Sequence, residues 1–100
     1  MLFKGEKMEV YCKKEAYGGT LEYKMIERYE ERSALGKIKT YGLSVKFYSE
    51  DDFDYYCVED VASKPQVVLQ LIKYLFDKDV KPENTYINIE NFIKSNSKIS

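Results

Sequence analysis

The sequence predicts an α+β domain, a four-stranded antiparallel β-meander with one helix packed across one face and a short C-terminal helix. Two observations predict it. The first two-thirds of the chain alternate apolar and polar residues with the period of a strand, interrupted by turn residues. The last third repeats its apolar residues with the period of a helix. We expect a single domain over residues 1–100, with the sheet in 1–60.

The first predicted hairpin surrounds the sequence AYGGT. Met8, Val10 and Cys12 alternate with polar residues in the strand before it. Gly18 and Gly19 can take the positive φ angles that a tight turn needs, so the chain should reverse there.

The second predicted strand follows this turn and has one irregularity. Ile26 and Glu27 interrupt its alternation, so we expect a bulge or an edge position near 26–27. Gly36, in ERSALGK, indicates a second turn. The residues expected on the inward face of the strand are Leu21, Tyr23, Met25 and Tyr29.

The third strand is the clearest, because YGLSVKFY alternates throughout. SEDD then interrupts the apolar pattern and FDYYCVED resumes an extended one, so residues 49–52 should form a hairpin tip. In this pattern Tyr48 and Tyr56 fall on the polar side of their strands. The inward residues of the third strand are Tyr41, Leu43, Val45 and Phe47.

A helix is predicted over 63–79. Ser63 and Gln66 have the spacing of a capping box, and Pro65 falls in the first turn, where its missing N–H costs nothing. Pro82 should end this helix by about Asp79. The apolar stripe expected to cover the sheet consists of Val68, Leu71, Ile72, Leu75 and Phe76.

A shorter amphipathic helix is predicted over 86–95, after a turn at PENT. Its apolar residues are Ile89, Phe92 and Ile93. Residues 96–100 are expected to form a polar tail.

Composition excludes several classes of function. The chain has no histidine, which removes the commonest general base and imidazole metal ligands. Its net charge is −1, and its basic residues are lysines except for Arg28 and Arg32, so the guanidinium forks favoured in nucleic-acid recognition are scarce. Nucleic acid is therefore disfavoured as a partner.

The two cysteines indicate the compartment. Cys12 and Cys57 lie in strand-like segments with no CxxC motif, so we expect free thiols in a reducing environment, with a disulfide as the alternative. The first ten residues lack an apolar run of signal-peptide length, and no stretch is long enough to span a membrane. These features predict a cytoplasmic protein.

The stretch EDDFDYYCVED, residues 50–60, is the main candidate for a site, with six carboxylates and no basic residue. One hypothesis is a negative surface presented to a basic partner, since tyrosines flank the charges. The other is a solvated turn whose charges prevent edge-to-edge sheet pairing. The candidate binding residues are Glu50, Asp51, Asp52, Asp54, Tyr48 and Tyr56.

Metal binding and catalysis at this stretch are disfavoured. A calcium loop that begins at Asp52 would place Cys57 where a glycine belongs and Ser63 where a glutamate belongs. An acid/base pair needs one buried carboxyl group, and acids at a polar hairpin tip are solvated. We therefore expect no catalytic residue, no metal and no cofactor.

The segments YGLSVKF, VEDVASKPQVVLQLIKYLFDKDVKPE and IENFI resemble small uncharacterised proteins of clostridia and related Firmicutes, which form a family of unknown function. The resemblance covers about residues 41–93 and consists of packing signals. It implies this fold and a bacterial source, and it carries over no functional residue.

These observations predict a non-catalytic binding module, a small cytosolic regulator or inhibitor that acts on a protein with a basic surface. A phage-type anti-defence inhibitor is one form of this function. One alternative is a small-ligand or enzymatic domain with a pocket between sheet and helix, for which Glu27 is the candidate. A second is single-stranded nucleic-acid binding, because ten tyrosines supply stacking surfaces. Homo-oligomers by sheet-edge pairing are a further expectation.

Overall fold

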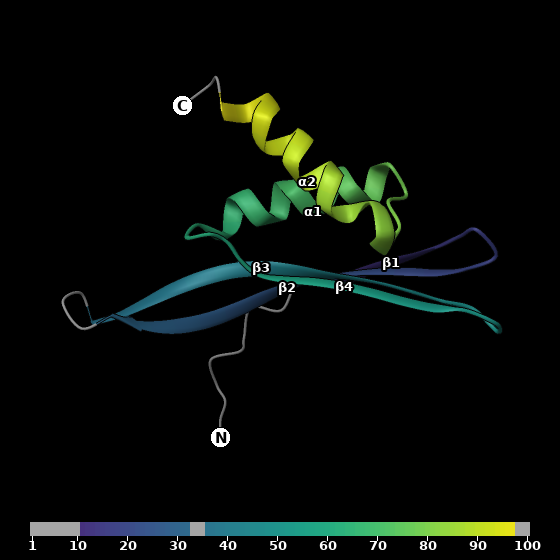
Figure 1. Cartoon of the computed structure of the whole chain (residues 1–100), viewed down its shortest axis with the longest axis horizontal. Coiled ribbons are helices and arrows are strands. Elements are labelled where there is room, and N and C mark those ends of the chain that lie inside the picture. Colours follow the sequence, from purple (N-terminus) through teal and green to yellow (C-terminus); the bar gives the residue numbers. More distant parts are fainter. Residues whose placement is uncertain (1–10, 33–35, 98–100) are drawn as a thin grey trace.

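The computed structural model describes residues 11–32 and 36–97 of the chain. Four antiparallel strands lie side by side in chain order, and two helices cover one face of the sheet (Figure 1). The predicted α+β meander is confirmed. Its elements are β1 Tyr11–Ala16, β2 Gly19–Arg32, β3 Gly36–Tyr48, β4 Phe53–Ala62, α1 Pro65–Asp77 and α2 Pro82–Ser97. Met8, Val10 and the centre of the predicted second turn, residues 33–35, lie outside the described residues.

The first turn is one residue earlier than expected. Ala16 pairs with Gly19, so the two turn residues are Tyr17 and Gly18, with φ angles of 55° and 74°. Gly19 is already part of β2 and serves a different purpose. A Cβ atom there would lie 2.5 Å from the carbonyl oxygen of Tyr48. Gly19 therefore allows β2 and β3 to pack closely beside the turn.

The bulge expected near 26–27 is wrong. β2 pairs with β3 without a shift from Thr20 to Arg32. The pairing of β1 with β2, within the described residues, ends at Lys24. The residues that would lie beside β2 beyond Lys24 are outside the described part of the chain, so the edge alternative stays a prediction.

A bulge occurs instead between β3 and β4. The register shifts between Tyr41, which pairs with Ala62, and Leu43, which pairs with Val58. Gly42 makes this possible, because a Cβ atom there would overlap the carbonyl oxygen of Val58 and the backbone of the bulge. The sequence gives no local sign of the bulge beyond this glycine.

The helix α1 begins at Pro65, as its fixed φ angle favours. The predicted capping box is wrong, because the N-cap residue is Lys64 and it makes no side-chain capping hydrogen bond. The helix ends at Asp77, two residues earlier than expected. The predicted apolar stripe is confirmed, since its buried residues are Val68, Leu71, Ile72 and Leu75.

The helix α2 is longer than predicted at both ends. Pro82 is its first residue, so PENT is its first turn rather than a loop. The helix continues to Ser97 and includes the first two residues of the predicted tail. Ile89 is buried and Phe92 packs against Tyr74, with ring centroids 5.3 Å apart. Ile93 is exposed, so the stripe of α2 is narrower than expected.

The core lies between the sheet and the helices. Tyr23 is completely buried, as are Leu21, Leu43 and Leu71. All of the inward residues predicted for β3 are buried. In the described part of the chain, no helix is both long and apolar enough to cross a membrane.

Three side chains of the β1–β2 hairpin donate hydrogen bonds to backbone carbonyls at the end of α1 and in the connection to α2. Burial and the charge of Asp79 raise the pKa of Tyr23, so its hydroxyl remains a donor. Lys14, one of these three side chains, also forms an ion pair with Asp79. The bonds run from Lys14 to Phe76 (2.9 Å), from Tyr17 to Asp79 (2.7 Å) and from Tyr23 to Val80 (2.9 Å).

Candidate functional site

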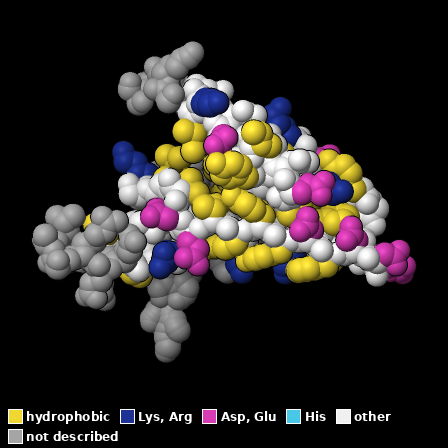
Figure 2. Space-filling view, in the orientation of Figure 1, with side chains coloured by type: hydrophobic (Ala, Val, Ile, Leu, Met, Phe, Trp, Pro, Cys, Tyr) yellow, Lys and Arg dark blue, Asp and Glu magenta, His cyan; other side chains and the backbone are white. Residues whose placement is uncertain are grey.

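The hairpin tip predicted at residues 49–52 is confirmed. The backbone N–H of Ser49 donates to the carbonyl of Asp52 at 2.9 Å and closes the turn. Glu50, Asp51 and Asp52 are exposed, and we call these three residues the acidic turn. Figure 2 shows acidic side chains gathered toward this end of the molecule.

The structure separates the two predicted binding tyrosines. Tyr48 lies on the sheet face without helices. Tyr56 pairs with Val45 and packs against the core, so its placement on the polar side of the strand is wrong. Asp54 is opposite Phe47 and shares the helix-covered face with Tyr56. Both faces of β4 carry apolar residues, and a one-residue error in such a strand exchanges its faces.

No helix of the described residues covers the other face of the sheet, and we call it the outer face. Two of its aromatic side chains are strongly exposed, Phe53 at 64% and Tyr55 at 52%. With Tyr48 they form an aromatic patch next to the acidic turn. The other outer-face residues near this end of the sheet are Lys13, Glu15, Thr20, Glu22, Lys24, Ser44, Lys46 and Cys57.

Sequence reasoning missed Phe53 and Tyr55. Their orientation follows from the pairing of β4 with β3. Val45 must face inward because β3 alternates so clearly, and the residue opposite Val45 then faces inward too. Tyr55 precedes that residue and therefore faces outward.

A small polar network lies beside the aromatic patch. The hydroxyl of Tyr48 donates to the carboxylate of Glu22 at 3.4 Å, and the ammonium of Lys46 lies 3.5 Å from the same carboxylate. A hydrogen bond with Cys57, followed by burial, raises the pKa of Tyr55, so its hydroxyl is protonated at neutral pH. The patch therefore presents aromatic rings, including a protonated Tyr55, among fixed charges.

The outer strand β4 protects part of its own backbone. The carboxylate of Asp54 accepts a hydrogen bond from the N–H of Tyr55 at 2.9 Å, and that of Asp52 accepts one from Phe53 at 3.0 Å. Two backbone donors of this strand are thus bonded to its own side chains. Together with the bulge and the charges, these bonds oppose the addition of another strand.

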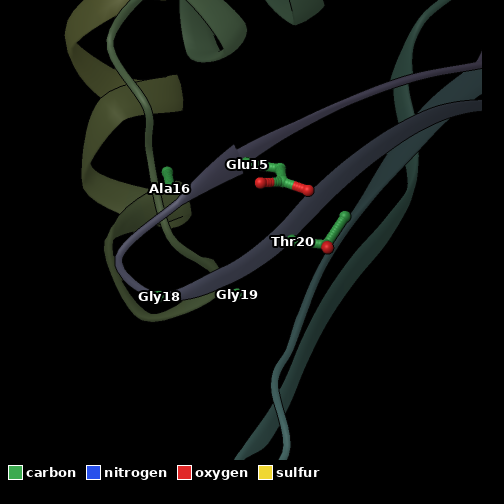
Figure 3. Close-up of a pocket in the computed structure, with 5 residues that line it drawn as sticks. All are labelled: Glu15, Ala16, Gly18, Gly19 and Thr20. Atoms are coloured by element: carbon green, nitrogen blue, oxygen red, sulfur yellow. The ribbon is translucent and has the colours of Figure 1, made fainter.

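Three surface hollows formed by the described residues are open to solvent. An open hollow of about 490 Å³ lies beside the β1–β2 turn, and Glu15 and Thr20 are its larger polar side chains (Figure 3). An open hollow of about 500 Å³ lies between Tyr17, the α1–α2 connection and α2. Another of about 260 Å³ lies along the β1–β2 hairpin beside Tyr48. Within residues 11–32 and 36–97, no three acidic or sulfur side chains cluster as a metal site would require.

Glu27, the candidate for a pocket between sheet and helix, does not line these hollows. Its side chain is only 13% exposed, and its carboxylate lies 3.0 Å from the ammonium of Lys39. Hydrogen bonds with Glu27 and Tyr29 raise the pKa of Lys39. The pair satisfies Oε2 of Glu27, whereas its Oε1 is buried without a hydrogen-bond partner among the described residues.

The expectation of free thiols is confirmed. Cys12 lies on β1 and Cys57 on β4, which are opposite borders of the described sheet, so about 14 Å separates their strands. Their side chains also point to opposite faces. A disulfide within one chain is therefore excluded by geometry.

Native alkylation should modify Cys57 well before Cys12. Cys57 is exposed, whereas Cys12 is half-buried and burial raises its pKa, with only partial opposition from Lys14. Peptide mass spectrometry after brief iodoacetamide treatment measures this order, and Cys57→Ala should leave only the slow reaction. Equal labelling of both thiols in the folded protein would contradict the placement of β1.

Searches of protein-family models, curated proteins and solved structures found no match to this chain.

Proposed function

We propose that the protein is a non-catalytic binding module, a small cytoplasmic regulator or inhibitor that contacts a partner protein through the aromatic patch and the acidic turn. The observation that supports it best is the exposure of Phe53 and Tyr55 beside three carboxylates. Exposed aromatic residues are favoured at interfaces because they supply contact area at small entropic cost.

The charges define the kind of partner. The acidic turn adds three negative charges at one border of the aromatic patch. A complementary partner carries basic residues around an apolar centre, so that its charges steer the encounter and the aromatic rings hold the complex.

Site-directed photo-crosslinking tests the surface. A photoreactive phenylalanine at position 53 should capture a partner in the source cell, whereas the same group at position 73, on the exposed face of α1, should not. Equal capture from both positions, or capture from position 73 alone, would contradict the proposed surface.

The purified partner then tests the acidic turn. Asp51→Asn with Asp52→Asn should slow association several-fold at low salt, with a smaller loss at high salt, because exposed charges mainly set the encounter rate. The free energy of unfolding should change by no more than about 0.5 kcal/mol. Stopped-flow association at two salt concentrations measures this. An unchanged rate at low salt would leave residues 49–52 as an ordinary solvated turn.

Single-stranded nucleic acid is a second candidate, favoured by the position of Lys46 between aromatic residues of the outer face. The acidic turn opposes it by repelling phosphates. Fluorescence anisotropy with labelled oligonucleotides separates the two, since binding that weakens steeply with added salt would support nucleic acid.

A further inference from the structure

One row of residues across the outer face complements itself. Strand pairing places Lys13, Glu22, Lys46 and Tyr55 opposite one another in order from β1 to β4. Their side chains all point away from the helices. The row therefore reads cation, anion, cation, aromatic ring.

Consider a second copy packed face to face on the outer face, related by a twofold axis that runs parallel to the strands and midway between β2 and β3. This row then lies on the same row of the second copy, in reverse order. Each β2 then covers the other copy's β3, and each β1 covers the other copy's β4. Glu22 faces the second copy's Lys46, and Lys13 faces the second copy's Tyr55. The first contact joins the ion pairs that Glu22 and Lys46 already form within each chain into a network of four charges. The second is a cation–π contact, which occurs twice.

The neighbouring rows are compatible with the same arrangement. Toward the turns, Thr20 would face the second copy's Tyr48, and Glu15 would face its Phe53. In the next row away from the turns, Lys24 would face Ser44. No row places like charges over one another, and both exposed aromatic residues of β4 become covered.

We propose that the outer face is the interface of a homodimer with this twofold symmetry. The self-protected backbone and bulge of β4 favour this face over the sheet edge. The surface is only about 14 Å wide across the four strands, so it is smaller than a typical stable interface, and the dimer is in equilibrium with the monomer. The dimer covers the aromatic patch, so the monomer is the form that can bind the proposed partner.

Sedimentation velocity over about a hundredfold range of concentration should show a reversible shift from monomer to dimer. Glu22→Lys and Lys46→Glu should each weaken self-association about tenfold or more, because each places two like-charged pairs at the axis. A chain that sediments as a monomer even at high micromolar concentration would overturn the proposal.

Mixing the two variants tests the symmetry. In a mixed dimer, Lys at position 22 of one variant faces Glu at position 46 of the other, and the second pair is a native Glu22 and Lys46 pair. The equimolar mixture should therefore dimerise at concentrations at which each variant alone is monomeric. A mixture that behaves like the separate variants would overturn the proposed axis.

A variant with both substitutions provides the control for folding. It restores opposite charges between positions 22 and 46, within each chain and between chains, although position 22 then lies opposite Lys13. It should therefore recover most of the dimerisation that each single variant loses. Loss of dimerisation in this variant, with circular dichroism unchanged, would also overturn the proposal. Asp51→Asn with Asp52→Asn lies beyond the paired rows and should leave the dimer intact, which separates this interface from steering by the acidic turn.

Discussion

Leu71→Ala is expected to lower the free energy of unfolding by about 2 to 5 kcal/mol. Leu71 lies at the centre of the α1 stripe and is completely buried against the sheet. Truncation removes apolar contacts and leaves a cavity that the rigid sheet cannot close. Urea unfolding followed by circular dichroism measures the loss.

Lys73→Ala is the matched control on the same helix. Lys73 is exposed and forms an i,i+4 ion pair with Asp77 at 3.1 Å. Loss of an exposed pair of this kind costs at most about 0.5 kcal/mol. Equal shifts of the urea midpoint for both variants would show that the assigned orientation of α1 is wrong.

Gly42→Ala is expected to be similarly severe, with a loss of about 3 kcal/mol or more. The added methyl group would overlap the carbonyl oxygen of Val58 and approach the carbonyl carbon of Glu59 to 2.6 Å. These are backbone atoms of the bulge, so no side-chain rotation relieves the contact. The bulge must open, and part of the β3–β4 pairing must be lost.

Gly18→Ala separates steric overlap from conformational strain. Gly18 has a φ angle of 74°, but a Cβ atom there would meet no other atom within 4 Å. Its substitution should therefore cost only about 1 kcal/mol. If Gly42→Ala unfolded at the same urea concentration as Gly18→Ala, the close approach of β4 to β3 would be disproved.

The sequence predicts best where one face of an element is strongly apolar. Leu43 and Val45 fix the inward face of β3 by alternation, and the spacing of Leu71, Ile72 and Leu75 fixes that of α1. In both cases the alternative orientation would expose large side chains, so local pattern and global packing agree.

Prediction fails where the pattern is apolar on both sides. In β4, Tyr55 and Tyr56 are adjacent tyrosines of similar β propensity, so alternation does not decide which one faces the helices. Pairing with β3 decides it, and this is a non-local contact. For the same reason the aromatic patch was not predicted from the sequence, although the acidic turn beside it was.

Helix ends were also hard to predict, because the residues that form them differ from the usual capping residues. Ser63 has the spacing of a capping residue, yet Lys64 occupies the N-cap position. At the other end of α1, the ammonium of Lys14 binds the carbonyl of Phe76. This end of α1 is also closed locally, because Asp79 has a φ angle of 52°, its N–H donates to Phe76, and the N–H of Val80 donates to Leu75. Asp79 is not a glycine, so the sequence did not mark this cap.

The hydrogen bonds from the first hairpin also determine when the protein can complete its fold during synthesis. Lys14 and Tyr17 each precede their carbonyl acceptors by 62 positions, and Tyr23 precedes its acceptor by 57. The ribosome therefore releases these donors long before the segment that receives them. Until α1 follows, the apolar side of the nascent sheet is exposed to chaperones and to other chains, so slow translation through residues 63–80 would favour misassembly.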